Sequence, residues 1–181
     1  MCNKSERGLT LIELLVFIVI VGIAANAMLA VFGSLTRNSA SLLPDKQAQA
    51  IASSMMNEIL AQPFTFCDPN DIRAATATSA TISPTGCASL LENMGPEPGE
   101  TRTIFDNVND YNGLVLNPVS NPGGVTVPGL PGYTVQVAVV GAGAFPGVPA
   151  AETLRVTVSV TAPNGTVTRL EGVRMRYAPT T

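Results

Sequence analysis

The fold is decided by an apolar stretch near the N-terminus, LTLIELLVFIVIVGIAANAMLAVF at residues 9–32. From Leu14 to Phe32 this stretch runs for nineteen residues without a charged side chain. As an α-helix, with a rise of about 1.5 Å per residue, nineteen residues span roughly 28 Å, which is close to the thickness of the hydrocarbon core of a bilayer. The stretch therefore predicts one membrane-spanning helix.

One carboxylate, that of Glu13, lies near the start of this apolar stretch. A charged side chain at the centre of a membrane helix costs on the order of 2.5 to 3.5 kcal/mol on insertion scales. The next basic residue along the chain is Arg37, and Arg7 lies upstream. Two interpretations are open: the carboxylate is tolerated near the membrane interface, or it has a partner from outside its own helix.

The residues before the stretch fit an ordinary secretory signal poorly. Lys4 and Arg7 supply its basic region, but the apolar run exceeds the usual core of about 7 to 15 residues. The alanines at positions 24, 25 and 27 form only an approximate cleavage site. Cleavage by a general signal peptidase is therefore not expected.

The sequence RGLTLIELL at residues 7–15 resembles the N-terminal signal of type IV pilins and type II secretion pseudopilins. In that family a membrane peptidase cleaves after a Gly and the new N-terminal residue is methylated, which the resemblance places at Gly8 and Leu9. The fifth mature residue of the family is Glu, here Glu13, and its carboxylate pairs with the N-terminal amine of a neighbouring subunit. The resemblance thus implies the partner that a carboxylate in an apolar helix requires.

Two later segments indicate a subfamily within this resemblance. Residues 55–68 and 105–113 are similar to the MshD family of minor pilins in mannose-sensitive haemagglutinin-type pili. This implies a minor type IV pilin, a structural subunit that is not an enzyme and needs no cofactor. Its implied partners are prepilin peptidase, other pilin subunits, the inner-membrane assembly machinery and membrane lipid. The implied location is the inner membrane, with a periplasmic head, and then the pilus at the cell surface.

Other functions remain as alternatives. A minor pseudopilin of a type II secretion or DNA-uptake system has the same N-terminal features, and an adhesive tip protein would need a ligand pocket as well. A membrane-anchored periplasmic enzyme or binding domain would have to use carboxylate pairs such as Asp68/Asp71 or Asp106/Asp110, and neither has a nucleophilic or basic partner nearby in the sequence.

Composition excludes several classes of function. The 181 residues contain no His, and 10 Lys and Arg stand against 13 Asp and Glu. Most common metal sites and every nucleophile paired with His are thereby excluded. The net charge of −3 provides no basic surface for nucleic acid, so none is expected as a partner.

A second helical pattern is expected from Asp45 to Gln62. Apolar residues recur there at spacings of three and four and form one face, namely Ala48, Ile51, Ala52, Met55 and Ile59. Pro44 predicts a restart or a kink of the helix, and Pro63 predicts its end. This apolar face needs a sheet to cover it.

The sheet is predicted from the last fifty residues. Apolar and polar residues alternate at 133–140, 154–160 and 166–177, with Gly172 as a possible bulge in the third strand. Asn164-Gly165 predicts a tight hairpin turn between the last two strands. The expected fold is α+β and pilin-like, a long N-terminal helix packed on an antiparallel sheet. Arg169, Arg174 and Arg176 are expected to give the final strand a charged, solvated or subunit-contacting face.

Between the helix and the sheet, residues 84–149 are rich in Pro and Gly and are expected to be mostly loops. Cys67 and Cys87, beyond the membrane segment, predict a disulfide in an oxidising compartment. The segment from Asp106 to Gly113 is rich in side-chain oxygens, which makes Asp106 and Asp110 weak candidates for calcium ligands. Asx turns without a metal are the leading expectation there.

The expected organisation has four parts. Residues 1–8 form the leader, residues 9–36 the transmembrane and assembly half of the helix, and residues 37–62 its amphipathic half. Residues 63–181 form the periplasmic head with the antiparallel sheet.

Overall fold

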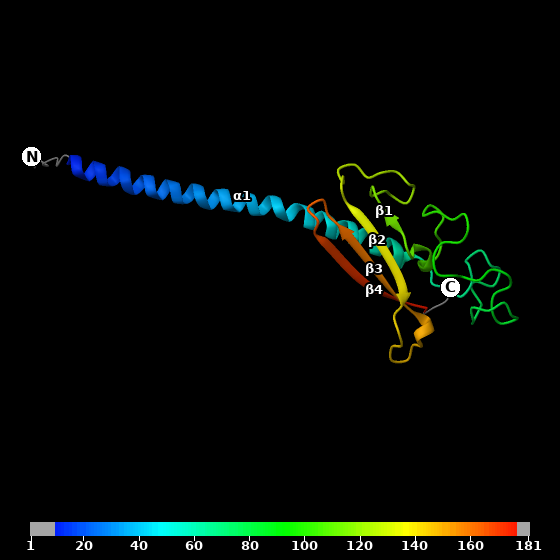
Figure 1. The fold of residues 1–181 in the computed structure, drawn as a ribbon. Helices are drawn as coiled ribbons and strands as arrows, with labels where there is room; N and C mark the ends of the chain where they lie inside the picture. Colours follow the sequence, from blue (N-terminus) through cyan, green and yellow to red (C-terminus); the bar gives the residue numbers. More distant parts are fainter. Residues whose placement is uncertain (1–9, 177–181) are drawn as a thin grey trace, which may run out of the picture. The chain divides into compact units, whose positions relative to one another are not determined.

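The computed structural model describes residues 10–176, except for the side chains of residues 34–41. Gly8 and Leu9, the predicted processing positions, lie outside the described residues. A single helix, α1 (Leu11–Ala61), runs through Gly33 and Pro44 (Figure 1). Pro44 therefore does not restart the helix, and α1 ends just before Pro63. By its contacts the chain divides into Met1–Leu43 and Pro44–Thr181, called the first and second unit below.

The second unit contains one antiparallel sheet of four strands in the order β1-β2-β3-β4 (Figure 1). The strands are β1 (Val115–Leu116), β2 (Thr134–Gly141), β3 (Thr153–Thr161) and β4 (Val167–Met175). Two short 3₁₀ helices, η1 (Val108–Tyr111) and η2 (Ala150–Glu152), lie in the connections. The three strands that the alternation predicts are confirmed, and the two-residue β1 is the only strand assigned within residues 84–133.

The C-terminal part of α1 and the sheet share one apolar core. The predicted helix face is confirmed, since Ala48, Ala52, Met55 and Ile59 are buried and Ile51 packs beside them. The sheet contributes alternate residues of β2 and β3, which are Val135, Val137, Val139, Leu154, Val156, Val158 and Val160. A sheet with one face on a helix buries the apolar half of each strand. The fold is thus the predicted pilin-like α+β arrangement.

The hairpin between β3 and β4 turns at Asn164-Gly165, as the sequence predicts. Gly165 has a φ of +83°, a conformation that Gly adopts without a steric penalty. The N–H of Ala162 donates to the carbonyl of Thr166 at 2.9 Å, and the Asn164 side chain accepts from the N–H of Thr166 at 3.1 Å. The turn sets the register in which Thr161 pairs with Val167.

Gly172 does not form a bulge, and this expectation is wrong. The register of β3 with β4 is continuous through the pair Val156–Gly172. The physical reason for Gly at this position is the close approach of α1. A Cβ on residue 172 would lie 2.9 Å from Met56 Sδ and 3.4 Å from Leu60 Cδ1.

Gly172→Val is expected to lower the free energy of unfolding by about 1 to 3 kcal/mol, because the added side chain overpacks the contact between β4 and α1. Gly141→Val is the matched control, since a Cβ there meets no atom within 4 Å. Denaturant unfolding of the full chain in detergent measures both. Equal stability of the two variants would contradict the role assigned to Gly172.

The basic residues near the final strand have different surroundings, which corrects the expectation of one charged face. Arg169 is exposed and pairs with Glu171 at 2.9 Å. Arg174 instead donates to the backbone carbonyl of Gln62, at the end of α1, at 3.2 Å. Residue 174 shares a strand face with Gly172, which contacts the helix, and this explains why Arg174 points toward α1.

Arg176 lies just past β4 and is largely buried. Its Nε lies 2.9 Å from a carboxylate oxygen of Glu152. Its guanidinium lies 3.8 Å from the ring centroid of Phe64 and 3.9 Å from that of Phe66, so it is stacked against two aromatic rings. These contacts attach the end of the sheet to the segment that follows α1.

A second set of polar contacts joins α1 to the loops. Arg102 donates from Nε and Nη2 to the two carboxylate oxygens of Glu58, at 2.8 and 2.6 Å. Its Nη1 donates to the carbonyl of Ser120 at 2.6 Å, and the hydroxyl of Tyr111 donates to Glu58 at 3.1 Å. This bidentate pair fixes an otherwise irregular segment to the helix.

Candidate functional site

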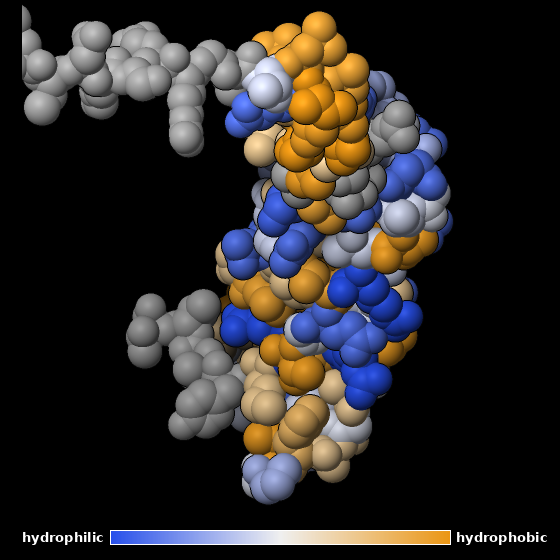
Figure 2. All heavy atoms as spheres, turned by 90° about the vertical axis from the view of Figure 1, so that its left-hand side faces the viewer, coloured by the Kyte–Doolittle hydropathy of each residue, from blue (hydrophilic) through white to orange (hydrophobic). Residues whose placement is uncertain are grey.

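The first unit presents an apolar helical surface. Leu11–Gly33 forms a span of 23 residues with a mean hydropathy of 2.8, long and apolar enough to cross a membrane. Its large apolar side chains are exposed, from 47% for Val21 to 82% for Leu11. Figure 2 shows apolar side chains gathered on the N-terminal part of α1, which faces the viewer. Such a surface needs lipid or other subunits to cover it.

Glu13 lies in the first turn of α1 and is exposed. Its N–H donates to the carbonyl of Thr10 at 3.1 Å and to Thr10 Oγ1 at 3.4 Å. The helix dipole favours a carboxylate at this end. Among the side chains that the structure describes, no basic group forms an ion pair with Glu13. The carboxylate is therefore placed where a cation from outside the described chain can reach it.

Asn26 is the other strongly polar residue within the apolar span. Its side-chain amide donates to the carbonyl of Gly22, one turn earlier, at 2.8 Å. An amide in hydrocarbon is costly when its hydrogen-bonding groups have no partner. This internal bond reduces the cost of placing Asn26 in a membrane or a fibre core, which leaves Glu13 as the one charged group of the span.

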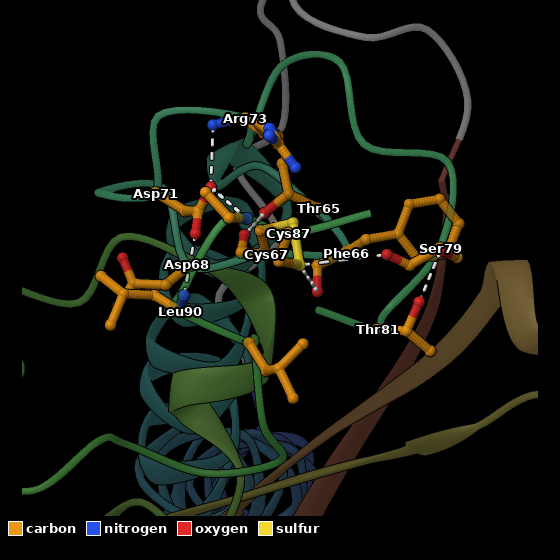
Figure 3. The surroundings of a disulfide bond; sticks show 12 residues. Thr65, Phe66, Cys67, Asp68, Asp71, Arg73, Ser79, Thr81, Cys87 and Leu90 are labelled. Atoms are coloured by element: carbon orange, nitrogen blue, oxygen red, sulfur yellow. Dashed lines mark hydrogen bonds between the residues drawn. A yellow bond between two sulfur atoms is a disulfide. The ribbon is translucent and has the colours of Figure 1, made fainter. Parts of the chain in front are cut away.

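The second unit contains the predicted disulfide between Cys67 and Cys87, with a Cα–Cα distance of 5.5 Å (Figure 3). Both residues are fully buried. The bond closes a segment rich in Ala, Ser and Thr that has no regular helix or strand. The disulfide therefore stabilises the fold of a segment that has no helix or strand of its own to hold it.

Asp71 organises the same segment through its carboxylate. Four backbone N–H groups donate to it, those of Arg73, Ala88, Ser89 and Leu90, at 2.7 to 3.1 Å. Figure 3 shows Asp71 with Arg73 and Leu90 beside it. These bonds hold the pKa of Asp71 far below its ordinary value. Its neighbour Asp68 accepts from the N–H of Asn70 at 2.6 Å. The pair Asp68/Asp71, a candidate for an enzyme on sequence grounds, is thus occupied with backbone groups.

The depressed pKa of Asp71 predicts an acid-sensitive contribution to stability. The stabilisation is fully present above the ordinary carboxyl pKa of about 4 and is lost as the pH falls toward the lower pKa of the folded state. Asp71→Asn is expected to lower the Tm above pH 4, because an amide nitrogen faces N–H donors, and the difference from wild type narrows on acidification. Thermal melts between pH 2 and 7 measure this. The exposed Glu171→Gln is the control, and a difference that is constant with pH would refute the prediction.

The two candidate calcium ligands, Asp106 and Asp110, have different partners in the structure. The N–H groups of Asp106 and Asn107 donate to Asp110 Oδ2 at 3.0 and 2.8 Å, so the Asx-rich segment does fold on its own backbone. Asp106 accepts from the amide of Asn70 at 3.1 Å. Asp110 instead converges with Glu92 and Glu97, and one carboxylate oxygen of each lies within 4.8 Å of the others.

This acidic cluster, Glu92, Glu97 and Asp110, has no ion-pair partner among the described side chains. Burial and the neighbouring carboxylates raise the pKa of Glu92 to about 9. Burial also raises the pKa of Asp110 to about 6 and that of nearby Glu100 to about 7. Sequence reasoning missed Glu92 and Glu97, because neither belongs to an oxygen-rich run. The available signal was the grouping of Glu92, Glu97 and Glu100 within one short loop.

Comparison with known proteins identifies the N-terminus. Residues 3–25 match the model of the prokaryotic N-terminal methylation motif. No curated protein and no solved structure matches the chain significantly. The motif is that of structural subunits, not enzymes, and with the anchor helix it places the chain in the inner membrane before assembly into a surface fibre. The chain is thus a prepilin-like protein that carries the N-terminal methylation motif of type IV pilins and pseudopilins.

Proposed function

We propose that the chain is a minor type IV pilin, most similar to those of mannose-sensitive haemagglutinin-type pili. The observation that carries the proposal is the combination of the methylation motif with an exposed apolar helix in which Glu13 is the single charged residue. The minor role rests on the resemblance of residues 55–68 and 105–113 to minor pilins.

The proposed mechanism of assembly is physical. Cleavage after Gly8 exposes the amine of Leu9, which is then methylated. The apolar surface of Leu11–Gly33 leaves the membrane and becomes buried among the helices of neighbouring subunits. In that apolar surrounding an unpaired carboxylate is strongly penalised, so Glu13 favours the one axial position at which it meets the amine of a neighbour. The pair sets the step between subunits.

Each segment of the chain then has its own role. Residues 1–8 direct processing, residues 9–36 anchor and assemble, residues 37–62 support the sheet, and residues 63–181 form the periplasmic head. The disulfide and the Asp71 contacts lie in the head, where an oxidising compartment permits the Cys67–Cys87 bond. The partners are other pilin subunits, prepilin peptidase, the inner-membrane assembly machinery and lipid.

Mass spectrometry of the protein from cells with and without prepilin peptidase tests the processing. We expect loss of residues 1–8 and one added methyl group on Leu9 only where the peptidase is active. A Gly8→Leu variant is expected to stay uncleaved, and Gly22→Leu, inside the helix, is the matched control. An intact N-terminus in cells with active peptidase would overturn the proposal.

Quantification in purified fibres separates a pilin from a pseudopilin. A minor pilin is expected in sheared pili at a small fraction of the major subunit, and deletion of its gene is expected to reduce piliation while type II secretion continues. Loss of secretion with normal piliation would assign the chain to a pseudopilus instead.

A further inference from the structure

The acidic cluster brings together carboxylates from two separate segments of the head. Glu92 and Glu97 belong to the loop that follows the disulfide, whereas Asp110 belongs to η1. One oxygen of each lies within 4.8 Å of the others. Three carboxylates at this distance cannot all stay ionised in a partly buried place unless a positive charge compensates them, so the cluster must hold either protons or a cation.

Buried oxygens without donors give an independent indication of a ligand. Asp110 is fully buried, and its Oδ1 has no hydrogen-bond donor within residues 10–176, while its Oδ2 accepts two backbone N–H groups. Both carboxylate oxygens of Glu92 are likewise buried without a donor among the described residues. A buried acceptor without a donor bears its full desolvation cost. These oxygens are those expected of ligands to a cation.

The nearby arginines form their ion pairs with other carboxylates. Arg176 interacts electrostatically with Glu92 from a distance, but its ion pair is with Glu152 at 2.9 Å. Arg102 is held by Glu58 at 2.6 Å. Among the side chains that the structure describes, no basic group lies within 4.0 Å of a carboxylate of the acidic cluster.

We propose that Glu92, Glu97 and Asp110 bind one Ca²⁺ ion. The donors are all oxygens, which select a hard cation over zinc or copper. Calcium fits better than magnesium, since its six to eight oxygen ligands follow no strict geometry, and carboxylates from irregular loops can bind it in one- or two-oxygen mode. Water completes the coordination. Affinities of about 10⁻⁴ to 10⁻³ M, typical of extracellular modules, suit a head outside the cytoplasm.

The ion links the loop after the disulfide to η1. The two segments already touch, since the N–H of Gly95 donates to the carbonyl of Asn109 at 3.0 Å. Tyr111, at the end of η1, donates to Glu58 of α1, so the ion also stabilises the contact between the loops and the helix. The stability of the head therefore depends on calcium.

Calcium titration of the full chain in detergent, after removal of metal with EDTA, tests the site. Isothermal titration calorimetry is expected to give one Ca²⁺ per chain, and the Tm is expected to rise by about 9 °C when Ca²⁺ is about one hundredfold above its Kd. Absence of binding and of a Tm change would overturn the proposal. An equal rise of the Tm with Mg²⁺ at the same concentration would also overturn the proposal, because it would show unselective screening of charge and no specific calcium site.

Variants connect the binding to these residues. Glu92→Gln is expected to weaken Ca²⁺ binding at least tenfold, yet in EDTA its Tm stays at or above that of wild type, because Gln keeps the shape of Glu92 and cannot ionise beside the other carboxylates. Glu97→Gln provides the same test should Glu92→Gln fold poorly. Glu171→Gln, exposed and on β4, is the control with unchanged affinity. Wild-type affinity in both cluster variants would refute the assignment.

Discussion

Glu13→Val is expected to yield a protein that is cleaved and methylated normally and yet is absent from the fibre. Removing a carboxylate makes insertion of the helix into the membrane easier, by up to about 3 kcal/mol on insertion scales. Poor insertion therefore cannot explain a loss of assembly. What is lost is the group that pairs with the Leu9 amine of a neighbouring subunit and favours one axial position over all others.

The measurement is the amount of the subunit in sheared pili relative to the amount in membranes. Ile12→Val, next to Glu13 and similarly exposed, is the matched control and is expected to assemble as wild type. Glu13→Gln, which keeps the shape and removes the charge, is expected to fail like Glu13→Val. Normal incorporation of both Glu13 variants would show that the carboxylate has no part in assembly.

The second large effect is expected from the double variant Cys67→Ser/Cys87→Ser. The disulfide closes a loop across a sequence separation of 20, and its removal is expected to cost about 3 kcal/mol in the chain-entropy model. For a unit of this size that corresponds to a Tm lower by about 10 °C. The loss should be larger than for an ordinary surface change, because the closed segment has little regular structure to keep it in place.

Thermal unfolding of the full chain with and without a reducing agent measures this effect. Reduction is expected to lower the Tm of wild type to that of the double variant and to leave the variant unchanged. Thr85→Ala, inside the same loop and exposed, serves as the control for substitution alone. A double variant as stable as wild type would mean that packing and the Asp71 contacts suffice.

The long helix, the sheet and the processing motif could all be predicted from the amino-acid sequence. Each depends on short-range patterns: an uncharged apolar run, apolar residues at spacings of three and four before Pro63, and alternation in three strands closed by Asn164-Gly165. Such patterns reflect the periodicity of helices and strands, which is local. The disulfide was predictable for a related reason, because only Cys67 and Cys87 follow the membrane span.

What lies between these elements was decided by the tertiary structure. Gly172 is needed because α1 approaches β4 closely. Arg174 and Arg176 do not join Arg169 in one solvated basic face, because the end of α1 lies beside Arg174 and two Phe rings lie beside Arg176. Glu92 and Glu97 meet Asp110 only after loops without periodicity fold back on η1. Periodicity encodes which face of an element is apolar, whereas a site assembled from irregular loops depends on long-range contacts that have no signature along the chain.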